Sequence, residues 1–198
     1  MRRIDYALIE DLVSHGSTVL DLACGDGELL SRLIRDKGVR GSGVDVSQEA
    51  VEACVRKGLS VFHGDLDAGL ADFAAGSHDV VILSMSLQQL RRPRMIVREM
   101  VRVGRQAIVS FPNFAHWTPR LQLFLGGRMP LSRDLPYQWW DTPNIHLCTI
   151  RDFRTLCREE GLSILQEQYL RSVNKPAPPR VVAPNLMARI AIFAVTRS

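Results

Sequence analysis

The 198-residue chain is 46% hydrophobic and 23% charged, and it carries a formal net charge of +4. This balance is typical of a globular domain and excludes disordered, collagen-like and repeat proteins. The longest apolar runs fall far short of the roughly 20 residues that a membrane-spanning helix needs. Acidic residues at positions 5, 10 and 11 interrupt any apolar core of a signal peptide. We therefore expect one soluble domain over residues 1–198, without a membrane segment.

The cysteines and histidines show no metal-binding spacing. The sequence has no CxxC pair and no group of clustered histidines. We therefore expect neither a zinc site nor a disulfide framework, but reduced, small apolar side chains in a cytoplasmic protein. The four residues are Cys24, Cys54, Cys148 and Cys157.

From the N-terminus, short apolar strands alternate with amphipathic helices. The first helix is expected where apolar residues recur at helical spacing from position 4. Ser47 is a favourable N-cap, and Pro93 suits the first turn of a helix. The expected helices lie at 4–14, at 28–36, after Ser47 and from Pro93. The expected strands are Thr18–Leu22, Gly41–Val46, Leu59–Phe62, Val80–Ser84 and Gln106–Ser110.

This alternation predicts an α/β fold, a doubly wound and mostly parallel sheet with helices on both faces and right-handed connections. Regularity returns towards the C-terminus, where Thr149 and Asp152 resemble a capping box for a helix to about residue 160. The last expected elements are the strands Ser163–Tyr169 and Arg189–Val195, joined by a proline-rich loop over Asn174–Asn185.

Between these two parts, residues 111–148 are rich in Pro, Gly, Trp and Tyr and show no clean periodicity. A stretch this long without regular structure is typically functional, so we expect an inserted lid or a docking surface. Its histidines are candidates for a general base, although hydrogen bonding within the loop is the more frequent role. Its tryptophans suit either a substrate cage or an interface. The candidates are His116, Trp117, Tyr137, Trp139, Trp140, Asp141 and His146.

An arginine stripe marks the helix that begins at Pro93. On a helix, Arg94, Arg98, Arg102 and Arg105 fall on one side, opposite apolar residues. A solvated outer face is the simpler interpretation, and a docking surface for an acidic partner is the alternative. Aromatic residues are not interleaved with the stripe, so we expect no nucleic-acid partner.

The strongest functional signal is the glycine loop over residues 23–27, between an apolar strand and a helix. Backbone groups at such a turn approach a ligand closely. A dinucleotide site would have a third glycine at position 30, where this chain has Leu30. Asp21, Asp26 and Glu28 would repel a pyrophosphate by about 1–4 kcal/mol for each close pair of charges. The loop therefore disfavours a nucleotide phosphate, and with it a nucleotide-dependent oxidoreductase.

S-adenosylmethionine fits this acidic loop better, because it carries an ammonium and a sulfonium and no phosphate. Asp45, at the end of the second strand, is placed to bind ribose hydroxyls. After the third strand, Asp65 is a candidate acceptor for the adenine amino group, and Leu66 is a candidate for packing on the ring. Asp45 as a helix-capping acid and Asp65 as a turn residue are the structural alternatives. All three sites follow strand C-termini, the edge at which open α/β sheets bind ligands.

These motifs resemble those of class I S-adenosylmethionine-dependent methyltransferases, and more closely those of the MetW family of methionine-biosynthesis proteins. The stretches that carry the resemblance are LDLACGDGELL at 20–30, VILS at 81–84, AIVSFPNF at 107–114, GRMP at 127–130 and DTPNIHLCTI at 141–150. One departure is Met85-Ser86, where the family tends to have Gln-Thr.

The resemblance implies a seven-stranded, Rossmann-like methyltransferase fold that binds S-adenosylmethionine or S-adenosylhomocysteine. It also implies action with a homoserine O-acyltransferase in methionine biosynthesis. We expect no metal ligand, because the cysteines and histidines lack a metal-binding spacing. The cofactor-binding residues that the resemblance implies are Asp21, Ala23, Cys24, Gly25, Asp26, Gly27, Asp45, Val46, Gly64, Asp65, Leu66, Leu83 and Ser84.

Two functions stay open for such a protein. Methyl transfer needs little beyond in-line positioning and exclusion of water, so the lack of a nucleophile–base pair does not exclude catalysis. The stretch Ser84-Met85-Ser86-Leu87 lacks the Asn-Pro-Pro-Tyr type of motif that grips an amine. The resemblance favours an accessory or regulatory subunit of the acyltransferase that responds to S-adenosylmethionine. A methyltransferase acting on an unidentified small molecule is the alternative, and no catalytic residue is assigned.

Overall fold

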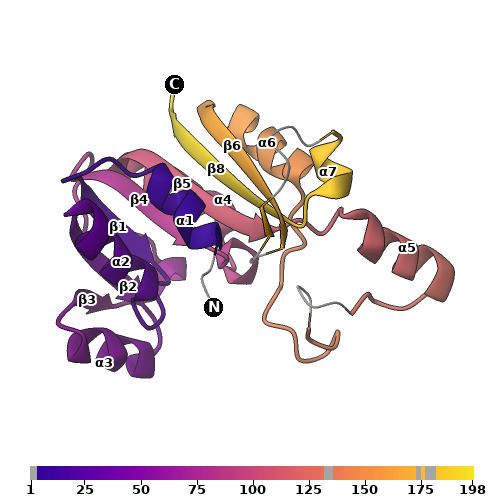
Figure 1. The fold of residues 1–198 in the computed structure, drawn as a ribbon, viewed down its shortest axis with the longest axis horizontal. Coiled ribbons are helices and arrows are strands. Elements are labelled where there is room, and N and C mark those ends of the chain that lie inside the picture. The colour runs from indigo at the N-terminus through magenta and orange to yellow at the C-terminus, as the bar shows by residue number, and fades with distance from the viewer. Residues whose placement is uncertain (1–3, 132–135, 173–174, 177–181) are drawn as a thin grey trace.

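The computed structural model describes residues 4–131, 136–172, 175–176 and 182–198, and a single sheet forms its centre (Figure 1). The strand order is β3-β2-β1-β4-β5-β8-β6-β7. Strands β1 to β5 pair in parallel, whereas β8 is antiparallel to both β5 and β6. The strands are β1 (Thr18–Leu22), β2 (Arg40–Asp45), β3 (Ser60–His63), β4 (His78–Ser84), β5 (Gly104–Pro112), β6 (Leu162–Ser172), β7 (Lys175–Pro176) and β8 (Ile190–Arg197).

The predicted α/β fold is confirmed. Within the described ranges, seven strands of at least four residues form a mixed sheet, and the two-residue β7 extends its edge. The chain winds outwards from β1 to β3 and then returns to place β4 on the other side of β1. This reversal makes the carboxyl ends of β1 and β4 the topological switch point, where open α/β sheets bind ligands.

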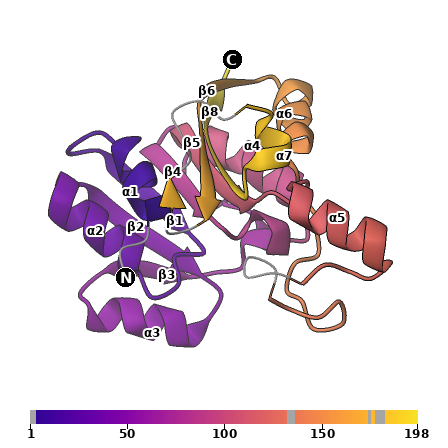
Figure 2. The same ribbon diagram turned by 45° about the vertical axis from the view of Figure 1, so that its right-hand side comes forward.

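Helices cover both faces of the sheet, because its central strands are apolar on both sides. In β4, Val80 and Ile82 join one apolar cluster, and Val81 and Leu83 join the other. Helices α1 and α2 pack on the first cluster and α4 and α6 on the second, as Figure 2 shows. The helices are α1 (Ile4–Asp11), α2 (Glu28–Lys37), α3 (Gln48–Arg56), α4 (Pro93–Val103), α5 (Trp117–Gly126), α6 (Ile150–Glu159) and α7 (Pro184–Met187), with 3-10 turns η1 (Leu66–Ala68) and η2 (Leu87–Gln89).

Local capping signals are confirmed at two helices. The Ser47 hydroxyl accepts the backbone N–H of Ala50 at 3.3 Å and starts α3. The Thr149 hydroxyl accepts the N–H of Asp152 at 3.2 Å and donates to its carboxylate at 2.6 Å. The predicted final strand pair is also present as β6 and β8. The loop expected over Asn174–Asn185 lies partly outside the described residues.

The expectation of no regular structure over 111–148 is wrong in part. Strand β5 continues to Pro112, and residues 117–126 form α5, whose N-cap His116 accepts the N–H of Thr118 at 3.2 Å. Pro119 is the one buried residue of α5. A helix that buries almost no face needs no apolar stripe, so its sequence shows no helical periodicity. The role of the segment as a lid or a docking surface stays a prediction.

Three arginines of the predicted stripe lie on α4 and are paired with acidic groups of this chain, whereas the placement of Arg105 on the same helix is wrong, because α4 ends at Val103 and Arg105 lies in β5. Arg94 and Arg98 both contact the carboxylate of Glu160, the residue that follows α6. Arg102 pairs with Glu99 at 2.7 Å. The two contacts with Glu160 join α4 to the end of α6, and the paired arginines make the solvated outer face the better of the two interpretations.

Candidate functional site

The glycine loop leaves the carboxyl end of β1 through three left-handed residues. Ala23, Gly25 and Gly27 have φ angles of 51°, 56° and 74°. The N–H of Gly27 bonds to the carbonyl of Cys24 at 3.0 Å, which closes the turn, and α2 begins at Glu28. Alternating left-handed residues let the chain reverse direction within five positions, and glycine adopts them without strain.

The two glycines of the loop serve different purposes. A Cβ added at Gly27 would lie 2.4 Å from Cδ1 of Leu59 and 2.9 Å from Sγ of Cys54. Gly27 is therefore required for the close packing of the loop against α3 and the turn after it. A Cβ at Gly25 would meet no atom within 4 Å, so this position borders open space. Gly25 is thus the position where a ligand has room to approach the backbone.

Asp45 holds the loop in place from the end of β2. Its Oδ2 accepts the N–H of Gly25 at 2.8 Å, and its Oδ1 accepts the N–H of Ser47 at 2.9 Å. The contact with Ser47 orders the turn before α3, whereas the helix itself is capped by Ser47, so the helix-capping alternative is wrong. Each carboxylate oxygen has a second lone pair, so these two bonds leave capacity for ligand hydroxyls.

A cavity of about 310 Å3 lies beside Asp45, at the carboxyl ends of the parallel strands. Its walls come from the glycine loop, from the ends of β2 and β3, and from the turn between β4 and α4. It is lined by Ala23, Asp45, Val46, Asp65, Leu66, Asp67, Ser86, Gln89 and Leu90. Five of these were predicted from the sequence, and three of the nine are aspartates. The cavity is therefore acidic and suited to a cationic ligand.

Four of the lining residues were missed by the sequence reasoning. Asp67 uses both carboxylate oxygens to accept the N–H groups of Arg91 (3.2 Å) and Arg92 (2.9 Å). It thereby ties η1 to the start of α4, a link that no local pattern reveals. Ser86 and Gln89 follow β4, and their position at a strand end was the available signal.

Asp65 also makes the turn contact that was its structural alternative. Its Oδ1 accepts the N–H of Asp67 at 2.9 Å and caps η1. Leu66 is 5% exposed and packs into the core next to the cavity. Gly64 donates its N–H to the carbonyl of Asp45 at 3.0 Å. It lines, with Asp65 and Leu66, a neighbouring cavity of about 560 Å3 along the edge strand β3.

Asp21 is the most perturbed carboxyl group near the site. It is 2% exposed in β1, in register with Gly43 of β2 and Ile82 of β4. Burial, followed by the charge of Asp45, raises the pKa of Asp21 from 3.8 to about 7. A cation placed nearby would favour its ionised form.

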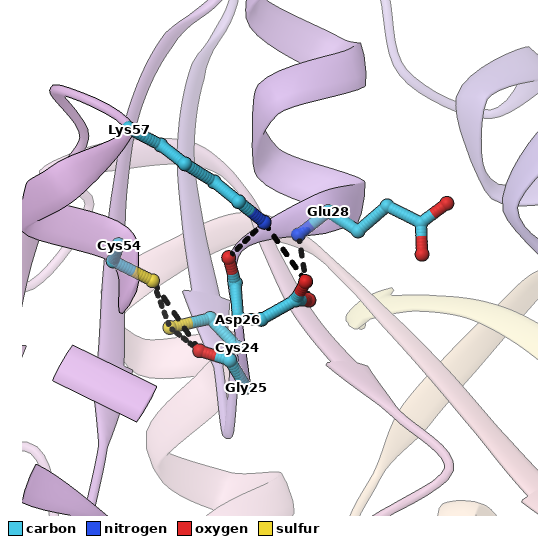
Figure 3. A network of polar contacts seen from close by, with 6 residues as sticks. All are labelled: Cys24, Gly25, Asp26, Glu28, Cys54 and Lys57. Atoms are coloured by element: carbon cyan, nitrogen blue, oxygen red, sulfur yellow. Dashed lines mark hydrogen bonds and ion pairs between the residues drawn. The ribbon is translucent and has the colours of Figure 1, made fainter. Parts of the chain in front are cut away.

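Two predicted site residues, Asp26 and Cys24, do not line the cavity, and Figure 3 shows the contacts that they make instead. The Lys57 ammonium contacts the carbonyl of Asp26 at 2.7 Å and its carboxylate at 2.8 Å. This hydrogen bond lowers the pKa of Asp26. The thiol of Cys24 lies 4.0 Å from that of Cys54, which donates to the carbonyl of Gly25 at 3.3 Å. Both side chains therefore anchor the loop to α3 and its end.

Leu83 and Ser84 are also absent from the cavity wall. Leu83 is fully buried in the apolar cluster, and the Ser84 hydroxyl lies 3.2 Å from that of Ser110. The next residue, Met85, has a φ of 57° and donates its N–H to Ser110. This left-handed turn directs the chain from β4 towards Ser86 at the cavity.

The two histidines of the 111–148 segment make hydrogen bonds with nearby or distant backbone groups. His116 is buried and caps α5. His146 is exposed, and its backbone N–H and that of Ile145 both bond to the carbonyl of Gln88, at 3.0 and 2.9 Å. Neither His116 nor His146 lines the acidic cavity. Within the described ranges, no cluster of three His, Cys, Asp or Glu side chains is arranged to hold a metal, and no helix meets the requirements for crossing a membrane.

Comparison with known families assigns this chain to one of them. The family model described as "Methionine biosynthesis protein MetW" matches residues 3–195. The chain belongs to the MetW family. A bifunctional methionine biosynthesis protein MetXA/MetW from Rhodopirellula baltica is 35% identical over 204 residues, which cover 98% of this chain and 33% of that protein. The chain thus spans about a third of the length of the curated relatives that it matches.

Solved structures place this MetW-family chain among class I methyltransferase folds. An S-adenosylmethionine-dependent methyltransferase from Archaeoglobus fulgidus has a TM-score of 0.70 at 14% identity, covering 100% of this chain and 95% of that one. The YcgJ protein of Bacillus subtilis gives 0.69 at 16% identity, with full coverage of both chains. Magnesium protoporphyrin IX methyltransferase from Synechocystis, solved with S-adenosylhomocysteine bound, gives 0.67 at 20% identity, covering 98% and 81%.

Proposed function

We propose that this MetW-family protein binds S-adenosylmethionine or S-adenosylhomocysteine in the acidic cavity at the ends of β1, β2 and β3. The acidic lining is the observation that carries the proposal. Asp45, Asp65 and Asp67 line the cavity, and the buried Asp21 lies close enough to Asp45 to feel its charge. Opposite charges a few ångströms apart attract by about 1–4 kcal/mol in such surroundings, so the ammonium of either ligand and the sulfonium of S-adenosylmethionine are favoured.

The cavity walls match the parts of the ligand. Asp45 has free lone pairs for ribose hydroxyls, and the second carboxylate oxygen of Asp65 is free for the adenine amino group. Leu66 offers an apolar surface to the ring. The open side of Gly25 gives the methionyl part access to backbone groups of the loop. The predicted contacts from Leu83 and Ser84 would require the ligand to extend beyond this cavity.

We further propose that the protein is an accessory or regulatory subunit of a homoserine O-acyltransferase in the cytoplasm. The support is the Rhodopirellula baltica relative, whose name joins MetXA and MetW in one polypeptide. Fusion holds two modules at a high effective concentration, and this favours their interaction. S-adenosylmethionine is a derivative of methionine, the product of the pathway. Binding it would let the subunit change the activity of the acyltransferase in response to the level of that product.

One assay tests both statements. Homoserine acylation by the purified acyltransferase is measured with and without this protein, at zero and saturating S-adenosylmethionine. We expect the rate to depend on the protein and to change again with the ligand. A rate indifferent to the protein would refute the accessory role and favour the alternative, a methyltransferase acting on a small molecule. Calorimetry without the acyltransferase tests ligand binding independently.

A further inference from the structure

Helix α5 exposes an unusual amount of apolar surface. Six of its ten residues are large and apolar or aromatic or proline, yet only Pro119 is buried. Phe124 is 84% exposed and Leu125 is 72% exposed. In both views of the ribbon, α5 projects away from the sheet and its covering helices (Figures 1 and 2). Its apolar side chains therefore have no large partner surface within the described chain.

The segment after α5 adds to the same surface. Trp139 and Trp140 are 69% and 66% exposed, with their rings edge to face. Of the nineteen large hydrophobic side chains exposed in the described ranges, twelve lie between residues 117 and 147. Monomers rarely expose such a concentration, and Trp and Tyr are favoured where proteins dock. We call the exposed apolar side chains of α5 and of residues 136–147 the α5 surface.

The α5 surface contains a cavity of about 160 Å3 between the helix and the following segment. Leu123 of α5 lies on one side, and Tyr137, Trp139 and Leu147 lie on the other. Arg120 lines this cavity, whose lining contains no lysine, histidine, aspartate or glutamate. The cavity therefore suits one apolar side chain of a partner, flanked by an acidic group that meets Arg120.

This surface is joined to the acidic cavity through η2. The carbonyl of Gln88 accepts the N–H groups of Ile145 and His146, and the adjacent Gln89 lines the acidic cavity. If ligand binding changes the turn between β4 and α4, the change is transmitted through Gln88 to Ile145 of the α5 surface and to His146. The position suits a partner whose activity follows ligand occupancy.

We propose that the α5 surface is where the homoserine O-acyltransferase docks, with an apolar side chain of that enzyme in the cavity beside Leu123. This inference rests on the proposed function. The relative that joins MetXA and MetW matches 98% of this chain and so extends through this segment, in a polypeptide that also carries the MetXA part. A second copy of this chain is the alternative occupant, and the test below distinguishes it by self-association.

The test measures binding of the full-length chain to purified homoserine O-acyltransferase by biolayer interferometry. The double variant Phe124→Asp/Leu125→Asp places two charges on the α5 surface at exposed positions, so folding is retained. The matched control is Val55→Asp, which adds a charge at a 61% exposed position on α3. We expect the double variant to weaken binding at least ~100-fold and the control to change it less than ~3-fold. Trp139→Ala/Trp140→Ala should weaken binding as well.

The outcomes separate the two proposals. Circular dichroism and the affinity for S-adenosylmethionine should be unchanged in the double variant, which shows that the fold and the acidic cavity are intact. If the wild-type chain binds the enzyme and both double variants bind equally well, the docking proposal is overturned and the accessory function stands. If the wild-type chain does not bind the enzyme, both fail. If the variants lose self-association in sedimentation but keep the enzyme, the surface is a contact between copies and the proposal is overturned.

Discussion

Replacing Asp21 by asparagine should stabilise the protein, although the residue lies next to the candidate site. Burial and the charge of Asp45 raise the pKa of Asp21 to about 7. The native state therefore keeps a proton that the unfolded chain has already released above its ordinary pKa of 3.8. A raised native pKa gives a contribution that is fully present below about pH 4 and is lost as the pH rises towards about 7.

The size of this loss follows from the shift of about three pKa units. Each unit is worth 1.36 kcal/mol, so at about pH 8 the wild-type chain is destabilised by roughly 4 kcal/mol relative to a permanently neutral group. At about pH 5 the unfolded carboxyl is only about one unit past its pKa, and the loss is roughly 1.5 kcal/mol. Asparagine carries no charge at either pH. The stability of the Asp21→Asn variant relative to the wild-type chain should therefore increase as the pH rises.

Urea unfolding followed by circular dichroism, at steps from about pH 5 to about pH 8, measures this difference. The free-energy gap between Asp21→Asn and wild type should widen by about 2–3 kcal/mol over this range. Asp11→Asn, at an exposed position on α1, is the matched control for removing a carboxylate at the surface. Affinity for S-adenosylmethionine should move the other way, because the variant loses a negative charge near the cavity. A gap that is independent of pH, or a variant less stable at pH 8, would refute the electrostatic reasoning.

Three further substitutions test the loop and its supports. Asp45→Asn should weaken S-adenosylmethionine by about 10–100-fold in calorimetry, since charge-assisted hydrogen bonds contribute about 1.5–3 kcal/mol; an unchanged affinity in a folded variant removes Asp45 from the site. Gly27→Ala should cost about 1–3 kcal/mol more in urea unfolding than Gly16→Ala, because both have positive φ but only Gly27 meets neighbouring side chains. Asn113→Ala should cost about 2–5 kcal/mol, because its buried amide bonds two carbonyls and one N–H near the end of β5; a loss below 1 kcal/mol would contradict that role.

Much of the site was predictable because its elements have recognisable local sequence patterns. A strand, a turn with alternating glycines and a helix are encoded within about a dozen consecutive residues around Gly25. Acids at the ends of successive parallel strands must share one edge of the sheet, so Asp45 and Asp65 were expected to be neighbours. The structure places both in the wall of one cavity.

Other predicted site residues do not line the cavity, because the direction of a side chain depends on contacts with distant parts of the chain. Asp26 turns to Lys57, 31 positions away, and the thiol of Cys24 turns to Cys54, 30 positions away. Leu83 is held in the apolar cluster that α4 and α6 cover. Nothing in the residues next to each of them specifies such a partner.

The sequence by itself determined the α/β alternation, the left-handed glycine loop and the caps at Ser47 and Thr149, because each depends on interactions within a few residues. Only the tertiary structure decided that α5 forms with almost no buried face, and that Gln88 joins the acidic cavity to residues 145 and 146. These features arise from contacts between segments far apart in the chain. The energy of such contacts depends on the whole fold, and no local pattern contains it.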